Sequence, residues 1–410
     1  MSLPAPALCS PEAVAVIGAS RKRGKIGNVV VRRLLSGPAA VFPVNPRADE
    51  IEGLPCYPEV KALPRPVDAA VICVPAPVVP SVLRDVVAAG IPLAIIQSGG
   101  FGETGDTGAD LEREIRRLIA GSRTRVIGPN TLGVVFPHTG YDTTFLSHEA
   151  FPPPAPGAIA LISQSGATAT TLMNRAGLYG IGFSGFVGLG NRIDVTEVEL
   201  LTFFAEDEHT RAIALYLESI SDGRALLQAL REVGQKKPVV VLKAGRTAAG
   251  SRAAALHTGS LAGSDRVLAG ALRQAGAHRV YDEEELLDYA LVLSLARPFA
   301  GQRVAVIGSG GGHGVILADY VEASDPGIGL KMAEFAPETR ERLAQVAVPH
   351  ASVQNPVDFT GDATVEMYAA ALEILQEDPG VDALIVSAQF EPPYIHEGLI
   401  DVIARYATPE

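Results

Sequence analysis

Short runs of consecutive apolar residues, rich in Val and Ile, alternate along this chain with longer segments in which apolar residues recur at helical spacing. A continuous apolar run of four to eight residues is typical of a strand that is buried on both faces, as the strands of parallel sheets are. Strands that alternate with helices predict crossover units and a parallel sheet in each domain. The pattern therefore predicts an α/β protein with tandem doubly wound parallel sheets.

Three of the apolar runs lead into a loop of small residues that opens a helix. They begin at Val14, Ala158 and Arg303, and are evenly spaced along the chain. Helix N-termini at the carboxyl ends of parallel strands offer free N–H groups to anions, so each loop is a candidate anion site. Glycine at such a junction also has a purely steric explanation, and one loop alone does not decide between the two.

A proline-rich stretch at 151–157 and the stretch "RPFAGQ" at 297–302 precede the second and third of these runs, and we interpret both as linkers. We therefore expect three α/β domains, which are residues 1–150, 157–297 and 301–410. The last of these ranges offers few strands for a doubly wound domain. We expect either an abbreviated third domain or a natural chain that continues past Glu410.

Composition narrows the class of protein. The chain has 410 residues, of which 47% are hydrophobic, and a formal net charge of -12, which argues against a nucleic acid or a membrane surface as its partner. Cys9, Cys56 and Cys73 are scattered without a Cys-x-x-Cys pair, so neither a zinc site nor a disulfide framework is indicated, and no metal site is expected. No targeting or membrane-spanning segment is evident, which predicts a cytoplasmic protein.

The first loop is unusually basic for an acidic protein, with "RKRGK" at 21–25. Gly18, Gly24 and Gly27 are spaced too widely for the dinucleotide fingerprint, and Lys25 is followed by Ile rather than the Ser or Thr of a P-loop. The next strand ends in Asn45 and Arg47, where a protein that reads the ribose of NAD has Asp or Glu. The basic residues suit a nucleotide with an extra phosphate, either NADP or coenzyme A, unless the loop is merely a solvated basic loop.

In the second loop, Ser163 and Ser165 lie where a predicted helix begins, so their hydroxyls and the helix N–H groups can hold a phosphate. His257 is also unusual, because it lies among Ala, Gly, Ser and Thr residues that give it little to pack against. From the surrounding residues alone, the favoured interpretation of His257 is an incidental position near a helix N-terminus.

Motifs from one end of the chain to the other occur in a recognisable order. They are "VIGAS" (16–20), "VNPR" (44–47), "CVPAP" (73–77), "SGGFGETG" (98–105), "IGPNTLGV" (127–134), "LISQSG" (161–166), "GLGNRIDV" (188–195), "YLES" (216–219), "HTGSLAG" (257–263), "GSGGGHGV" (308–315) and "NPVDF" (355–359). In this order they resemble the nucleoside-diphosphate-forming acyl-CoA synthetases, which include succinyl-CoA synthetase α subunits and ADP-forming acetyl-CoA synthetases. The resemblance covers nearly the whole chain.

The resemblance implies a Rossmann-like CoA-binding domain followed by two flavodoxin-like domains of the succinyl-CoA synthetase type. It implies that His257 is phosphorylated during turnover, that Glu218 orients its ring, and that Ser163, Ser165 and Gly166 bind the phosphate. The residues that match the CoA-binding motifs are Gly18, Ser20, Arg21, Gly24, Gly27, Asn45, Arg47, Val74, Pro75, Pro129 and Asn130.

Four further polar residues remain open. Asn191, Arg192 and Asp194 match a loop near the family's active site, but they also suit a loop that caps a helix. His313 lies where the family needs glycines, so we expect it to decorate the surface.

The family interconverts acyl-CoA, phosphate and a nucleoside diphosphate with carboxylic acid, CoA and a nucleoside triphosphate, and its nucleotide and Mg²⁺ bind to an ATP-grasp domain. No segment of this chain matches such a domain, so the resemblance implies an α-type chain that needs an ATP-grasp subunit or fused domain, in a hetero- or homo-oligomer. One alternative is a CoA-sensing module of a lysine acetyltransferase, in which the histidine is often lost. The other is an NADP-dependent oxidoreductase, for which no hydride-transfer residues are evident. The acyl group and the choice between ADP and GDP stay open.

Overall fold

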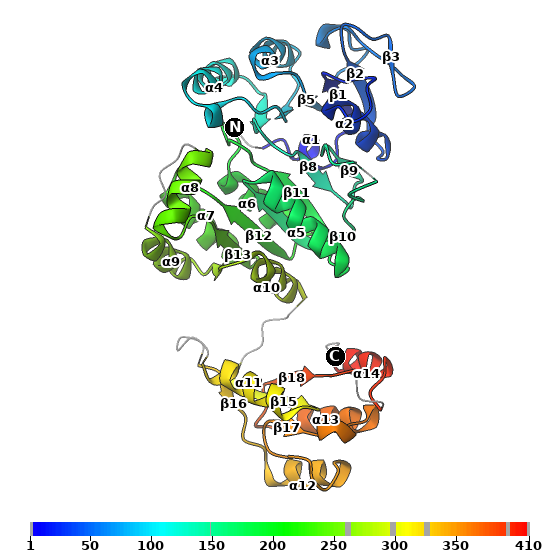
Figure 1. The fold of residues 1–410 in the computed structure, drawn as a ribbon, viewed down its shortest axis with the longest axis vertical. Coiled ribbons are helices and arrows are strands. Elements are labelled where there is room, and N and C mark those ends of the chain that lie inside the picture. The colour runs from blue at the N-terminus through cyan, green and yellow to red at the C-terminus, as the bar shows by residue number, and fades with distance from the viewer. Residues whose placement is uncertain are drawn as a thin grey trace. The chain divides into compact units, whose positions relative to one another are not determined.

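A computed structural model describes residues 3–147, 149–258, 264–295, 301–323, 329–390 and 394–407, with the backbone alone for 254–258. The chain forms two compact units, Met1–Ala296 and Arg297–Glu410. Each unit contains parallel strands that are joined through helices, as Figure 1 shows, and this confirms the predicted α/β class. No helix in these described ranges is long and apolar enough to cross a membrane.

The first sheet is fully parallel, with the strand order β2-β1-β5-β6-β7. Every residue of its central strands β1, β5 and β6 is buried, because helices cover both faces and continuous apolar runs fill them. The chain reverses its winding between β1 and β5, and ligands of such sheets bind at that point, beyond the carboxyl ends of the strands. The elements are α1 Ala5–Cys9, β1 Ala13–Ile17, α2 Ile26–Leu35, β2 Ala40–Val44, β3 Glu50–Ile51, β4 Leu54–Pro55, η1 Val60–Ala62, β5 Ala69–Ile72, η2 Ala76–Val78, α3 Val79–Ala88, β6 Leu93–Ile96, η3 Gly102–Thr104, α4 Asp106–Ile119 and β7 Arg125–Ile127.

The second sheet has the order β14-β13-β12-β10-β11-β8-β9, and its first five strands are parallel. Helices α5 and α10 pack on one face, while α6, α7 and α9 pack on the other. The last two strands, β8 and β9, come from residues 134–142; β8 pairs antiparallel with β11 and β9 pairs antiparallel with β8, so a segment close to the first domain in sequence extends the second sheet. The elements are β8 Val134–Phe136, β9 Tyr141–Asp142, β10 Pro156–Ser163, α5 Gly166–Leu178, β11 Phe183–Gly188, α6 Glu197–Glu206, β12 Ala212–Leu217, α7 Gly223–Gly234, β13 Val239–Lys243, α8 Ala248–Thr258, α9 Asp265–Gln274, β14 His278–Val280 and α10 Glu283–Leu295.

A buried arginine ties the first sheet's helix α2 to the segment that enters the second sheet. The Arg33 side chain is fully buried and pairs with Asp142 at 2.8 Å. It also donates to the carbonyl oxygens of Leu146 and Phe151. A buried guanidinium needs this full set of acceptors, so the contact fixes α2 against the chain that leads to β10.

The second unit contains a small parallel sheet in which β15 pairs with β16, β17 and β18. Its core lies between this sheet and α12, α13 and α14. The elements are β15 Arg303–Gly308, α11 Gly311–Glu322, β16 Lys331–Met332, α12 Pro337–Val346, β17 Val357–Asp358, η4 Thr360–Asp362, α13 Val365–Gln376, β18 Ala383–Ser387 and α14 Gly398–Ala407.

Candidate functional site

The glycine loop between β1 and α2 is shaped by close backbone packing. Gly18 has a φ of +87°, and a Cβ on Gly27 would lie 2.1 Å from the carbonyl oxygen of Gly18, so no side chain fits at Gly27. Gly24, at φ +80°, turns the exposed tip of the loop. The basic residues 21–25 at this tip are exposed and directly precede the N-terminus of α2.

The loop after β2 is joined to this tip. The Asn45 side chain donates to the carbonyl oxygen of Ala19 at 2.6 Å and accepts from the backbone N–H of Arg47 at 2.8 Å. The Arg21 guanidinium donates to the Arg47 carbonyl oxygen at 3.2 Å. Asn45 thus holds the two loops together, while the side chain of Arg47 stays exposed. The structure therefore brings these predicted CoA-binding residues to one place.

The remaining predicted CoA-binding residues lie at the same edge of the first sheet. A Cβ on Gly18 would lie 2.9 Å from the Val74 side chain, so the β1 and β5 loops are in contact there. The Ser98 hydroxyl donates to the Val74 carbonyl oxygen, and the Asn130 N–H donates to the Ser98 carbonyl oxygen at 2.9 Å. Pro75 and Asn130 are exposed, whereas Pro129 is buried after a cis peptide bond.

The N-terminus of α5 forms the second part of the site. Ser165 is the N-cap, and its hydroxyl accepts from the N–H of Thr168 at 3.2 Å. The Ser163 hydroxyl donates to the Ser165 carbonyl oxygen at 2.8 Å, so it braces the turn. The backbone N–H groups of Gly166 and Ala167 have no acceptor within the described part of the chain. This helix end therefore offers two donors and a positive dipole end to an anion.

The Glu218 carboxylate lies beside this helix end. Glu218 directly follows β12 and is 9% exposed. Burial raises the pKa of Tyr216 and the neighbouring Glu218 raises it further, while Thr168 in the first turn of α5 lowers it. Glu218 and the α5 N-terminus therefore both lie near Tyr216. A group that gives or takes a phosphoryl group between them could contact both.

Two polar residues that hold this edge together were not among the predicted site residues. The Gln164 side chain accepts from the N–H of Glu218 at 2.7 Å and of Ser219 at 3.0 Å, and it donates to the Ser219 carbonyl oxygen at 2.9 Å. The Lys243 ammonium donates to the carbonyl oxygen of Glu218 at 2.8 Å and also to that of Ala244. The sequence gives only a weak indication of these two residues, because each is simply a polar residue that ends or follows a buried apolar run.

The segment 191–194 links this edge to the first domain. Asn191 donates to Glu103 at 2.6 Å and to Glu112 at 2.7 Å. Burial alone would raise the pKa of Glu103, but hydrogen bonds from Asn191 and from backbone N–H groups outweigh it and lower that pKa. Arg192 pairs with Glu197 at 3.0 Å and donates to the Ser219 hydroxyl at 2.7 Å. These residues hold the two domains together close to the candidate site.

Asp194 has a structural role in this arrangement. Its carboxylate pairs with Arg125 at 2.9 Å and accepts from the N–H of Val126 at 2.7 Å. Arg125 also pairs with Glu199 at 2.8 Å. Asp194 thus joins the end of the first sheet to the start of α6.

The backbone of His257 belongs to the last turn of α8, but its side chain lies outside the described residues, as does the rest of its motif, 259–263. Helix α8 packs against the 3-10 turn η3 of the first domain. The chain that carries His257 therefore reaches the predicted CoA-binding domain, as can be followed in Figure 1.

In the second unit, His313 is exposed, and its Nδ1 lies 3.1 Å from the amide nitrogen of Gln389. The predicted surface role of this residue stays a prediction. Over the described ranges, no three His, Cys, Asp or Glu side chains gather in a way that could hold a metal ion.

Three family models match the chain in succession. They are described as a CoA binding domain (residues 12–137), a succinyl-CoA ligase like flavodoxin domain (156–293) and a Ligase-CoA domain (304–404). These matches confirm the predicted succession of a CoA-binding domain and domains of the succinyl-CoA synthetase type.

Similar proteins carry related names. The acetate–CoA ligase [ADP-forming] I of Archaeoglobus fulgidus is 39% identical over 92% of this chain, but the chain spans about half the length of this and other curated relatives. The α subunit of acetate–CoA ligase [ADP-forming] I from Pyrococcus furiosus is 39% identical over 93% of this chain and 82% of the relative.

A solved structure agrees with these relatives. The dinucleotide-forming acetyl-coenzyme A synthetase 1 of Ca. Korarchaeum cryptofilum, in complex with phosphate and ADP, matches with a TM-score of 0.89 and 36% identity, over 99% of this chain and 87% of that one. The chain therefore belongs to the nucleoside-diphosphate-forming acyl-CoA synthetases that its motifs predict, and among them to the ADP-forming acetate–CoA ligase family.

Proposed function

We propose that this chain is the α-type part of an ADP-forming acyl-CoA synthetase that binds CoA in its first domain and carries a phosphoryl group on His257. The observation that carries the proposal is the edge of the second sheet, where Glu218 and the free N–H groups at the N-terminus of α5 lie side by side. Hydrogen-bond donors for the phosphate and a carboxylate for the cationic ring are the two features that a phosphohistidine needs.

CoA binds at the switch point of the first sheet. Arg21, Lys22, Arg23, Lys25 and Arg47 are exposed there, and none of them forms an ion pair with a described residue. Together with the N-terminus of α2 they suit the phosphates of CoA. The thiol end of the cofactor is then directed towards the turn η3, against which α8 packs.

The reaction proceeds through three transfers. An oxygen of inorganic phosphate attacks the acyl carbon of acyl-CoA, and the C–S bond breaks to give an acyl phosphate and the CoA thiolate, which takes up a proton. A nitrogen of His257 then attacks phosphorus, and the carboxylate leaves. Finally, ADP takes the phosphoryl group as the N–P bond breaks. Glu218 accepts the N–H on the other ring nitrogen and stabilises the positive charge that the ring acquires.

The nucleotide step requires a partner. We assign ADP, ATP and Mg²⁺ to an ATP-grasp subunit or fused domain, as the α-subunit name of the Pyrococcus relative suggests, in a hetero- or homo-oligomer. We place the reaction in the cytoplasm, where Cys9, Cys56 and Cys73 stay as thiols. The names of the relatives do not decide which acid is the substrate, since one is named for acetate and another for 4-hydroxybutyrate.

Labelling tests the proposal. The chain is mixed with acetyl-CoA and [³²P]phosphate, and the labelled residue is identified by mass spectrometry. We expect an acid-labile, base-stable label on His257 that the His257→Ala variant lacks, with CoA affinity changed by no more than a few-fold. A chain that binds CoA but takes up no label, from acetyl-CoA or from a longer acyl-CoA, would instead be a CoA-sensing module, and tighter binding of NADP than of CoA would contradict the CoA site.

A further inference from the structure

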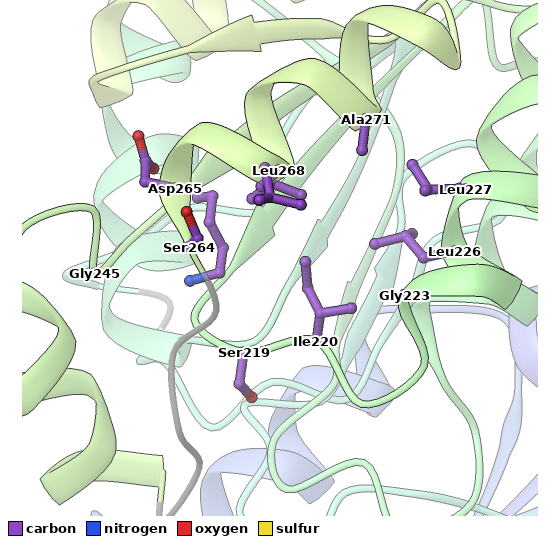
Figure 2. A pocket seen from close by; sticks show the side chains of 12 residues that line it. Ser219, Ile220, Gly223, Leu226, Leu227, Gly245, Ser264, Asp265, Leu268 and Ala271 are labelled. Atoms are coloured by element: carbon purple, nitrogen blue, oxygen red, sulfur yellow. The ribbon is translucent and has the colours of Figure 1, made fainter.

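A cavity of about 290 Å³ lies between α7 and α9, at the carboxyl ends of β12 and β13. Figure 2 shows the apolar side chains Ile220, Leu226, Leu227 and Leu268 directed towards this space from several elements. Its volume is near the lower limit of the range for small-molecule sites. Walls of this kind favour an apolar group, since burying apolar surface is worth roughly 25 cal/mol per Å².

One end of the cavity carries a charge that the reaction scheme above does not use. Lys243 is 7% exposed and is the one cation among the described residues that line the cavity. Its ammonium has three donors, and two of them serve the carbonyl oxygens of Glu218 and Ala244. No carboxylate in the described ranges lies within ion-pair distance of it: Asp265, the acid among the lining residues, pairs with Arg279, and the charges of Asp265 and Glu218 act on Lys243 from farther away.

A buried cation without an ion-pair partner is costly, and burial accordingly lowers the pKa of Lys243. An anionic ligand group would compensate this cost. The position is also suitable for the reaction, because the Lys243 ammonium lies 2.8 Å from the carbonyl oxygen of Glu218, the residue assigned to the ring of His257.

We propose that this cavity binds the carboxylic acid substrate, with its carboxylate on Lys243 and its chain against Ile220, Leu226, Leu227 and Leu268. The assignment rests on the proposed function and names its substrate class, which is monocarboxylic acids with an apolar chain longer than that of acetate. Acetate would leave the apolar walls uncovered. A dicarboxylate such as succinate would bring a second charge among apolar side chains without a second cation in the described lining.

Binding to the full chain, without any partner, tests this assignment. Isovalerate, phenylacetate, acetate and succinate are titrated by calorimetry and by ligand-observed NMR. We expect isovalerate and phenylacetate to bind at least tenfold more tightly than acetate or succinate. Equal binding of all four acids, or preference for succinate, would overturn the assignment.

Two kinds of variant locate the bound acid. Leu268→Phe and Leu227→Phe each fill the cavity from a different helix, and we expect each to weaken phenylacetate binding at least tenfold while acetate binding changes less. Leu178→Phe makes the same change at a position that is 80% exposed at the end of α5, and should change nothing. Unchanged phenylacetate binding in both cavity variants would place the acid elsewhere and refute the proposal.

Lys243→Met removes the charge, and we expect at least a tenfold loss of affinity for isovalerate but an unchanged affinity for its neutral amide, which is weak in both proteins. Failure of the cavity assignment can be distinguished from failure of the proposed function, because binding of the acid needs no phosphohistidine. Acids that bind as expected to a chain whose His257 takes up no label, even from the acyl-CoA of a bound acid, would support the cavity assignment and contradict the phosphoryl-transfer scheme.

Discussion

The side chain of Gln164 offers a sharp test of how the phosphoryl-transfer site is assembled. It lies between Ser163 and Ser165, and its three hydrogen bonds hold the backbone of Glu218 and Ser219. It thereby sets the distance between the α5 N-terminus and Glu218. Gln164→Glu keeps the shape and the acceptor oxygen, but it replaces the amide donor with an oxygen that faces the carbonyl oxygen of Ser219.

The expected loss of phosphorylation rate follows from replacing this one amide group with a carboxylate oxygen. Loss of a hydrogen bond together with an unsatisfied, part-buried carbonyl costs about 1–3 kcal/mol. The repulsion is relieved by movement of Glu218 away from α5, and a displacement of about 1 Å at a reacting centre can cost about 100-fold in rate. We therefore expect phosphorylation of His257 to slow by about 10- to 100-fold. CoA affinity should stay within a factor of two, because the CoA-binding loops belong to the first sheet.

The assay compares the rate of label uptake from acetyl-CoA and [³²P]phosphate with the dissociation constant for CoA and the melting temperature. Gln228→Glu is the matched control, since Gln228 is exposed on α7 and its amide donates to Glu232 at 3.0 Å. A normal phosphorylation rate in Gln164→Glu would show that the link to Glu218 does not position the site. Equal losses of rate and CoA affinity would show that Gln164 supports the whole fold instead.

Three further outcomes are expected from other parts of the chain. Arg33→Met breaks the buried ion pair between Arg33 and Asp142 and should lower the free energy of unfolding by about 3–5 kcal/mol, measured with urea; a loss below about 1 kcal/mol would contradict this. Arg47→Ala should weaken CoA binding by about 1.5–3 kcal/mol by calorimetry if its side chain contacts a phosphate, whereas unchanged affinity would mark it as solvated. Hydrogen bonds from the Arg303 side chain and from backbone N–H groups hold the pKa of Asp382 far below its usual value. The stability that the ionised Asp382 carboxylate adds to the fold is therefore present above the unfolded pKa of about 3.9 and is lost as the pH falls through the folded pKa. Asp382→Asn should flatten this acid dependence of the melting temperature.

The fold and the family could be predicted because both depend on patterns among residues that are close together in the sequence. The five residues of β1 are apolar and all are buried, and Gly27 must be glycine because the backbone of Gly18 passes where its side chain would be. The same applies to Ser165, whose capping bond to Thr168 is a short-range contact. Short-range rules of this kind can be read from neighbouring letters of the sequence.

Other parts of the site could not be predicted, because they depend on contacts between distant segments. Gln164 reaches residues 54 and 55 positions away, and Asn191 reaches Glu103 across 88 positions. The cavity beside Lys243 arises only where α7 and α9 meet the ends of two strands. Nothing in the neighbouring sequence marks such a contact, since a polar residue after a strand is equally common on a solvated loop.

The segment 191–192 connects the two functions that we assign to this unit. Asn191 is hydrogen-bonded to Glu103, whose carboxylate accepts from the N–H groups of Gly100 and Phe101 in the loop that leads into η3. The next residue, Arg192, donates to the hydroxyl of Ser219, directly after Glu218. Asn191 and Arg192 are adjacent in the chain, so we expect a shift of the loop at residues 100–103 on CoA binding to affect the strand end that carries Glu218. Ion pairs of Arg125 with Asp194 and Glu199 hold this segment to the first sheet, which makes the connection a stiff one.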